Sequence, residues 1–99
     1  MIVKTHQTED KRILLVVCDN EILGKKFEEG NKQLDLTSDF YKGIEKTELE
    51  VCDLMRNCDM INLVGEKVIN LAIKEGVIDS EHVKKISDIP YAQVVIQGL

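Results

Sequence analysis

An uninterrupted run of six apolar residues at positions 13–18 is the feature that most constrains how this chain can fold. Six residues are about a third of the length of a membrane-spanning helix, so the run predicts a strand. A strand that is apolar at every position is covered on both faces, which predicts a central place in a sheet. Residues 2–6 are compatible with a strand and residues 8–11 with a polar turn, so the chain is expected to start with a β-hairpin.

Two helices are expected further along the chain. Thr47 and Glu50 have the spacing of a capping box, in which each side chain bonds the backbone amide of the other residue. A second helix is predicted over residues 60–75, with Gly65 on its apolar stripe and Gly76 just past its end. Because a glycine inside a helix costs about 1 kcal/mol relative to alanine, we expect another backbone, that of a strand, to approach closely at Gly65.

The remaining segments predict a short strand at 33–36, a shorter third helix capped by Asp79 or Ser80 and running through Val83 and Ile86, and a final strand at 91–96. The fold class is therefore α+β, with an N-terminal β-hairpin, a small and mostly antiparallel sheet, two to three helices, and a C-terminal strand that returns to the sheet. A length of 99 residues suits one domain over residues 1–99.

Composition excludes several classes of protein. The net charge of −5 repels polyanions as a whole, so we expect no DNA partner, and any RNA contact needs a local basic patch. We expect no membrane partner and a cytoplasmic location, because the N-terminus lacks the pattern of a signal peptide. The three cysteines have no Cys-x-x-Cys spacing, which disfavours a disulfide scaffold and a zinc site. We therefore expect no metal and no cofactor.

Adjacent aromatic and basic residues give the clearest binding signal. Phe40 and Tyr41 precede Lys42, and exposed aromatic rings beside a cation are what base stacking uses. Lys25 and Lys26 belong to the less acidic half of the chain, where a phosphate contact is expected. The structural alternative is that Phe40 fills the core, that Tyr41 lies over the surface, and that the lysines belong to a surface of mixed charge.

Two further groups of residues have both a chemical and a structural interpretation. Asn62, expected near the start of the second helix, would help the first-turn amides to bind an anion, or it would cap the helix. Cys18 beside Asp19 would be a nucleophile only if a cation offset the burial of the thiolate. A structural thiol and a carboxylate that caps or forms a turn are the alternatives.

Several ordered segments resemble one family. They are Cys18-Asp19, Leu23-Gly24-Lys25, Phe27-x-Glu29-Gly30, Phe40-Tyr41-x-Gly43, Asn62-Leu63-Val64-Gly65-Glu66, Gly76-Val77-Ile78-Asp79 and Ile89-Pro90-Tyr91-Ala92-Gln93. In this order they look like the archaeal domain of unknown function 424 family, and the resemblance covers nearly the whole chain. It implies a role in RNA binding or translation. The family pattern often has a histidine where this chain has Tyr91, which weakens an enzymatic interpretation and leaves Tyr91 for stacking or hydrogen bonding.

The leading hypothesis is a non-enzymatic module that contacts structured RNA or a ribonucleoprotein. Its expected RNA-binding residues are Lys25, Lys26, Phe40, Tyr41, Lys42 and Tyr91. The first alternative is an adaptor whose acidic helical face docks on a basic protein partner. The second is a small enzyme that acts on an anionic substrate through Cys18 and Asp19 or through Asn62.

Overall fold

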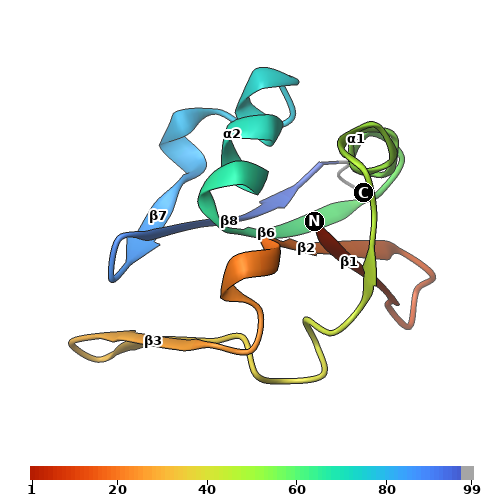
Figure 1. The fold of residues 1–99 in the computed structure, drawn as a ribbon. Helices are drawn as coiled ribbons and strands as arrows, with labels where there is room; N and C mark the ends of the chain where they lie inside the picture. The colour runs from red at the N-terminus through yellow and green to blue at the C-terminus, as the bar shows by residue number, and fades with distance from the viewer. Residues whose placement is uncertain (97–99) are drawn as a thin grey trace.

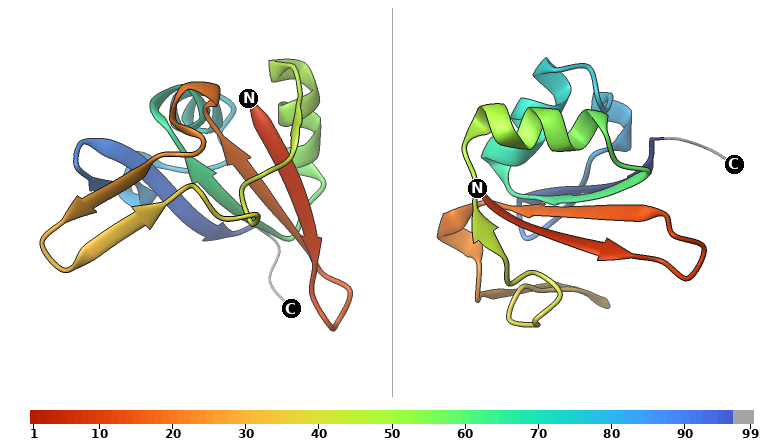
Figure 2. Two further views of the ribbon diagram at one scale, coloured as in Figure 1. Left: turned by 60° about the horizontal axis from the view of Figure 1, so that its bottom comes forward. Right: turned by 90° about the vertical axis from the view of Figure 1, so that its right-hand side faces the viewer.

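The computed structural model describes residues 1–96, which form an α+β fold. In chain order its elements are β1 (Ile2–Gln7), β2 (Ile13–Cys18), the 3-10 helix η1 (Asn20–Ile22), β3 (Lys26–Glu29), β4 (Lys32–Asp35), β5 (Ile44–Glu45), α1 (Glu48–Arg56), β6 (Met60–Val64), α2 (Glu66–Lys74), the 3-10 helix η2 (Ser80–His82), β7 (Lys84–Ile86) and β8 (Ile89–Val95). The order in the main sheet is β5-β1-β2-β6-β8-β7, and β3 pairs with β4 separately. Both α-helices lie on one side of the main sheet and the β3–β4 hairpin on the other (Figures 1 and 2).

The N-terminal hairpin and the central place of β2 are both confirmed. β1 pairs antiparallel with β2 over its whole length, and β6 pairs parallel with β2 on its other side. The turn that joins β1 to β2 is closed by Thr8, whose hydroxyl accepts a hydrogen bond from the Arg12 amide at 3.0 Å. Every other pairing in the main sheet is antiparallel, as the mostly antiparallel prediction requires.

The capping box that was expected to start α1 is present. The Thr47 side chain accepts from the Glu50 amide at 3.3 Å, and the Glu50 carboxylate accepts from the Thr47 amide at 3.1 Å. These two bonds satisfy amides that a helix N-terminus otherwise leaves without partners. Val51, Cys52 and Met55 then bury one face of α1 against the sheet, so local capping and long-range packing agree.

The helix predicted over residues 60–75 is wrong at its start. Residues 60–64 form the strand β6, and α2 begins only at Glu66. β6 is flanked by β2 and β8 and is largely buried, and Asn62 is its only polar residue, so its mostly apolar sequence satisfies the helical and the strand period equally well. Gly65 therefore precedes α2 with φ +116°. The backbone of β8 approaches it as expected, since the Gly65 amide donates to the Pro90 carbonyl oxygen at 2.9 Å, and the Asp19 side chain occupies the place of a Cβ atom.

The C-terminal part also differs from the prediction in one element. The expected third helix is only the 3-10 helix η2, and Ile86 lies in the strand β7 instead. Asp79 is the N-cap residue of this short helix as expected, and its amide donates to the His82 Nδ1 atom at 3.0 Å. β8 pairs with both β6 and β7, so the predicted return of the last strand to the sheet is confirmed. The short strand expected at 33–36 corresponds to β4.

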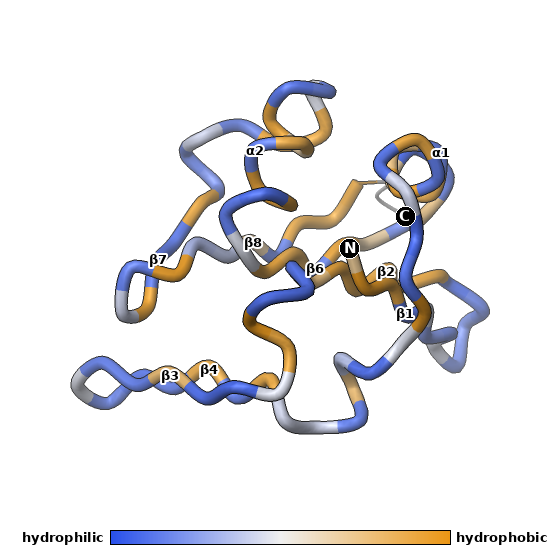
Figure 3. The backbone as a smooth tube through the Cα atoms, viewed as in Figure 1, coloured by the Kyte–Doolittle hydropathy of each residue, from blue (hydrophilic) through white to orange (hydrophobic). Residues whose placement is uncertain are grey.

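Two apolar clusters lie on opposite faces of the main sheet. The first is formed with the helices and includes Leu15, Met55, Leu63 and Val68. The second is formed with the β3–β4 hairpin, and its buried members are Cys18, Leu34, Leu36, Val64 and Ile86. In Figure 3, hydrophobic segments concentrate in the central strands, whereas the tip of the β3–β4 hairpin is hydrophilic. The hairpin covers only part of its face, and this determines where a ligand has access.

None of the helices among residues 1–96 is long and apolar enough to cross a membrane.

Candidate functional site

The face of the main sheet opposite the helices carries two rows of side chains beyond the β3–β4 hairpin. Because successive side chains of a strand point to opposite faces, the strand register identifies the members of each row. The first row consists of Lys4, Val16, Asn62 and Gln93, and the second of His6, Leu14, Met60 and Val95. We call these eight residues the open face. They come from four neighbouring strands, so a rigid sheet fixes their spacing.

A groove of about 330 Å³ lies on the open face. Its lining consists of Leu14, Met60, Ile61, Asn62, Gln93, Val94 and Val95. Met60 and Leu14 are half-buried and Val95 is 58% exposed, so apolar surface here remains in contact with water. Among the described residues that line it, none is charged, and the polar side chains are the two amides of Asn62 and Gln93. We call this feature the amide groove.

Asn62 is the one buried polar residue of the open face. It is 8% exposed, and its Oδ1 atom has no hydrogen-bond partner among the described residues. Its side chain lies near the Tyr41 hydroxyl; burial raises the pKa of Tyr41, and the Asn62 side chain acts in the opposite direction. Because a buried carbonyl oxygen without a partner costs free energy, Asn62 is a position where a ligand donor would be favoured.

Phe40 and His6 form an aromatic stack at one end of the open face. Their ring centroids are 4.5 Å apart with an interplanar angle of 11°, and the His6 Nε2 atom lies 3.1 Å from the Phe40 carbonyl oxygen. Phe40 also meets Tyr41 edge to face at 5.1 Å. Phe40 is only half-buried and lies outside both clusters, so the structural alternative that it fills the core is wrong. Tyr41 is the ring that packs against the second cluster.

Two cations lie beside this stack. The Lys42 ammonium is 3.0 Å from the Asp39 carboxylate. Its hydrogen bond to that carboxylate, followed by its positive charge, lowers the pKa of Asp39. The Lys4 ammonium donates to the Asp39 carbonyl oxygen at 3.4 Å. Both contacts are solvent-exposed, and exposed ion pairs contribute little free energy, so a phosphate can compete for these cations.

The predicted RNA-binding residues divide into three places. Phe40 and Lys42 lie beside the open face. Tyr41 and Tyr91 pack against the second cluster, half-buried, with Tyr91 directly opposite Val64 in the sheet. Lys25 and Lys26 are exposed at the base of the β3–β4 hairpin, where Lys26 pairs with Glu28 at 3.4 Å. The structure therefore brings the aromatic segment close to Asn62 and leaves the two hairpin lysines on a separate element.

Sequence reasoning missed His6, Leu14, Met60 and Gln93 as members of one surface. The signal available was a single polar residue within an apolar strand: Asn62 interrupts residues 60–64, as Gln93 interrupts the last strand. In a two-sided strand such a residue faces water or a ligand. Placing residues 60–64 in a helix concealed the register between these two amides.

The start of α2 is not the anion site that Asn62 was expected to mark. Asn62 lies in the middle of β6, so its predicted place at a helix start is wrong. The first amides of α2 already have an anionic partner, because the Asp19 carboxylate accepts from Lys67 and Val68 at 2.9 Å each. Asp19 is 4% exposed and is therefore a capping residue, as its structural interpretation predicted. An external anion at this helix end would have to displace it.

Cys18 has the environment of a structural thiol. It is a fully buried member of the second cluster, and burial, followed by the nearby Asp19 carboxylate, raises the pKa of Cys18 to about 12. Its Sγ atom is within hydrogen-bond distance, 3.4 Å, of the Asp19 carbonyl oxygen. Burial likewise raises the pKa values of Cys52 and Cys58. A neutral thiol is a poor nucleophile, so the geometry favours the structural interpretation of Cys18.

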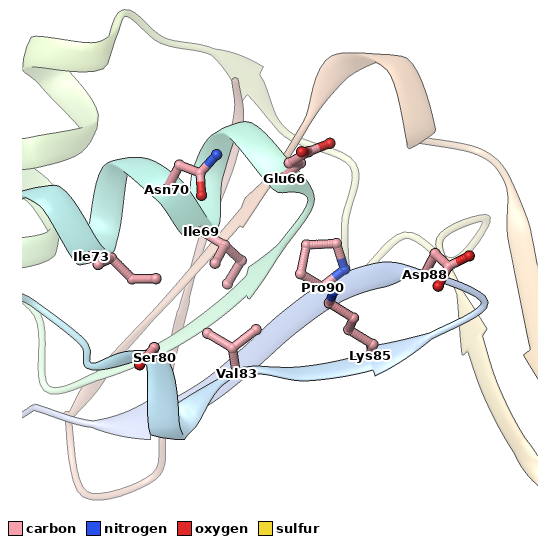
Figure 4. Close-up of a pocket in the computed structure, with 9 residues that line it drawn as sticks. All are labelled: Glu66, Ile69, Asn70, Ile73, Ser80, Val83, Lys85, Asp88 and Pro90. Carbon is pink, nitrogen blue, oxygen red and sulfur yellow. The ribbon is translucent and has the colours of Figure 1, made fainter.

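A second groove, of about 400 Å³, lies between α2 and the β7–β8 hairpin (Figure 4). Ile69, Ile73 and Val83 approach one another at one end, and Lys85 reaches toward Pro90 at the other. Its polar lining residues are all exposed and carry both signs of charge: Glu66, Asn70, Ser80, Lys85 and Asp88. Asn62 in the amide groove, by contrast, is buried. Among residues 1–96, no cluster of three His, Cys, Asp or Glu side chains has the arrangement of a metal site.

Comparisons with known proteins identify the family. The crystal structure of an uncharacterized conserved protein from Methanopyrus kandleri is similar with a TM-score of 0.80 and 19% sequence identity, and the match covers 99% of this chain and 92% of that one. At this identity the likeness shows the fold alone. A search of curated proteins gave no match. Residues 6–96 match the model of the family described as Protein of unknown function (DUF424), so the chain belongs to the DUF424 family, as the ordered segments indicated.

Proposed function

We propose that this protein is a non-enzymatic module that binds an unpaired segment of RNA on the open face. The observation that carries the proposal is the combination, on one side of a rigid sheet, of a half-exposed aromatic stack, an uncharged groove and a buried amide with an unused acceptor. Proteins that recognise single-stranded RNA combine aromatic rings for stacking with polar groups that bond base edges. Each of these parts is present within the open face and the adjoining Phe40.

The aromatic stack supplies the stacking surface. Stacking of a base on an aromatic side chain contributes about 1–3 kcal/mol, and it needs a ring held in a fixed orientation. Phe40 stacks on His6 and meets Tyr41 in a T-shaped contact. The half-buried Phe40 ring is therefore oriented before any base arrives, which reduces the entropy lost on binding.

Charge makes a smaller contribution to the proposed binding. With a net charge of −5 the molecule does not attract RNA over a distance, so the phosphate contacts must come from Lys4 and Lys42 beside the stack. Each phosphate neutralised on a single strand contributes about −0.7 to the slope of log K against log salt concentration. Two contacts predict a slope of about −1.4, much shallower than that of a basic RNA-binding protein.

The test is fluorescence anisotropy with a labelled single-stranded RNA of about ten nucleotides, repeated over a range of salt concentrations. Phe40→Ala is expected to weaken binding by about tenfold. Lys42→Ala is expected to make the salt slope shallower by about 0.7, whereas Lys74→Ala, an exposed lysine at the end of α2, leaves it unchanged. No saturable binding, or equal binding by wild type and Phe40→Ala, would contradict the proposal.

The lysines of the β3–β4 hairpin provide a separate arm of the same test. Lys25 and Lys26 were predicted to contact phosphate, and both are exposed at the hairpin base. If the RNA extends from the open face across the second cluster to the hairpin, Lys25→Ala/Lys26→Ala lowers the affinity and the salt slope together. An unchanged slope would restrict the RNA site to the open face.

The adaptor is the second candidate function, and one observation favours it. Leu49 on α1 is 80% exposed between Glu48 and Glu50, so the helix presents an apolar side chain among carboxylates. Such a surface fits a basic protein partner. A pull-down from native cells, with and without ribonuclease, compares the two candidates. Partners lost on ribonuclease treatment support RNA binding, and partners that survive it but are lost from Leu49→Asp support the adaptor.

A further inference from the structure

We propose that the amide groove holds one adenine base of the bound RNA. This inference deepens the proposed function and rests on it, because it names the base that the open face would recognise. It also makes a separate claim, since a protein can bind single-stranded RNA by stacking alone without choosing a base.

The two amides of the groove lie in register. Asn62 in β6 is directly opposite Gln93 in β8, so their side chains project from the same face of the sheet as cross-strand neighbours. Asn62 is buried with a free Oδ1 atom, whereas Gln93 is exposed and its side chain makes no hydrogen bond to another described residue. Gln93 is therefore free to bond a base edge with its donor and acceptor together, and the buried amide of Asn62 lines the groove beside it.

An amide side chain matches adenine in particular. A carboxamide places one donor beside one acceptor, and adenine presents the complementary pair in its N6 amino group and N7 nitrogen. Guanine is bound best by Arg or Lys, and cytosine by a carboxylate that accepts from its amino group. The described lining of the amide groove contains neither a cation nor a carboxylate. Its chemistry therefore disfavours guanine and cytosine.

Uracil is the remaining competitor, and the apolar walls of the groove disfavour it. Leu14, Met60 and Val95 form the sides of the groove, and each retains exposed surface. A purine covers more of this surface than a pyrimidine does, and burial stabilises by about 25 cal/mol per Å² of apolar area. The same shape also suits the base of a free adenine nucleotide, so the experiment must distinguish a base within RNA from a free one.

The experiment compares a labelled RNA of about ten uridines with three otherwise identical RNAs that carry one central adenosine, cytidine or guanosine. We expect the adenosine RNA to bind about five- to tenfold more tightly than the others, a difference within the range of one bidentate base contact. Gln93→Leu is expected to abolish that preference. Gln33 lies on β4 and is also exposed, so Gln33→Leu is the matched control and is expected to retain the preference for adenosine.

A second variant keeps the test informative if Gln93→Leu weakens all binding. Gln93→Glu places a carboxylate in the groove, which is expected to transfer the preference from adenosine to cytidine. Gln33→Glu adds the same charge away from the groove and should leave the preference with adenosine. Folding of each variant is checked by thermal unfolding, and Gln93 is exposed, so the backbone pairing of β8 should persist.

The outcomes separate this inference from the proposed function. Equal affinity for all four RNAs, together with weaker binding by Phe40→Ala, would overturn the adenine site and leave RNA binding intact. Absence of binding to every RNA would overturn both. Adenosine monophosphate is titrated as an unlabelled competitor. If the monophosphate competes at the same concentrations as the adenosine RNA, the groove binds a free nucleotide as well as it binds RNA, which would overturn the assignment to RNA. Competition only at much higher concentrations supports a base within RNA.

Discussion

A Cβ atom at Gly65 would lie 2.3 Å from the Cγ atom of Asp19, so the absence of a side chain at one residue makes room for the carboxylate of the other. The two residues follow the parallel strands β2 and β6, whose ends lie side by side. The Asp19 amide also donates to the Val64 carbonyl oxygen at 3.0 Å. The start of α2 is thus fixed by a carboxylate that comes from a different strand of the sheet.

Gly65→Ala is expected to destabilise the fold by about 2–5 kcal/mol. The new methyl group would overlap the Asp19 side chain, and φ of +116° is a strained backbone conformation for alanine. Gly30→Ala is the matched control, because Gly30 also has positive φ, of 60°, but a Cβ atom there would meet no neighbour within 4 Å. Its cost should be about 1 kcal/mol. Urea unfolding of the two variants measures the difference, and equal costs would show that the Asp19 contact is unimportant.

Asp19→Ala is expected to lower the free energy of unfolding by about 2 kcal/mol. The substitution leaves the amides of Lys67 and Val68 without the carboxylate that accepts from them at 2.9 Å. Asp53→Ala removes an exposed carboxylate from α1 and should cost nothing. Hydrogen exchange at Lys67 and Val68 adds a local measurement. Faster exchange there in Asp19→Ala is expected, and unchanged protection would contradict the capping role.

The sequence was sufficient wherever a local rule and the global packing agree. Thr47 and Glu50 cap α1 because their spacing alone determines the capping geometry. The strand at 13–18 is central because six apolar residues need cover on both faces. Gly76 follows α2 with φ +72°, as expected of a glycine just past a helix end. These predictions did not require knowledge of any distant residue.

The errors occurred where distant residues decide the structure. Nothing near residues 60–64 indicates that β2 and β8 flank them, so helix and strand remained equally compatible with their apolar pattern. The register that aligns Asn62 with Gln93 depends on the same long-range pairing, which is why the open face was not predicted. Phe40 is half-buried and Lys42 is exposed, but His6, which stacks on Phe40, lies 34 residues from it in the chain and was not predicted to do so.

Tyr41→Phe is expected to destabilise the protein by about 1–3 kcal/mol, because it removes the hydroxyl that lies near the buried Asn62 amide. Tyr91→Phe is the matched control. Tyr91 belongs to the same cluster and is also half-buried, but its hydroxyl makes no hydrogen bond to another described residue. That variant should unfold like wild type. Equal stability of Tyr41→Phe and Tyr91→Phe in thermal unfolding would show that the hydroxyl of Tyr41 does not support Asn62.

The burial of Cys18 predicts a loss of stability at alkaline pH. Its pKa is about 12 in the folded protein and 9.0 as an ordinary thiol, so the folded state holds this proton more tightly than the unfolded state does. The stabilisation is therefore complete below pH 9 and decreases as the pH rises toward 12, by up to about 1.4 kcal/mol per pH unit. Urea unfolding of wild type and Cys18→Ala, under reducing conditions between about pH 8 and 10.5, measures this term as their difference. That difference should be constant up to about pH 9 and should then shrink. A difference that stays constant through about pH 10.5 would mean that the Cys18 thiol has an ordinary pKa in the folded protein.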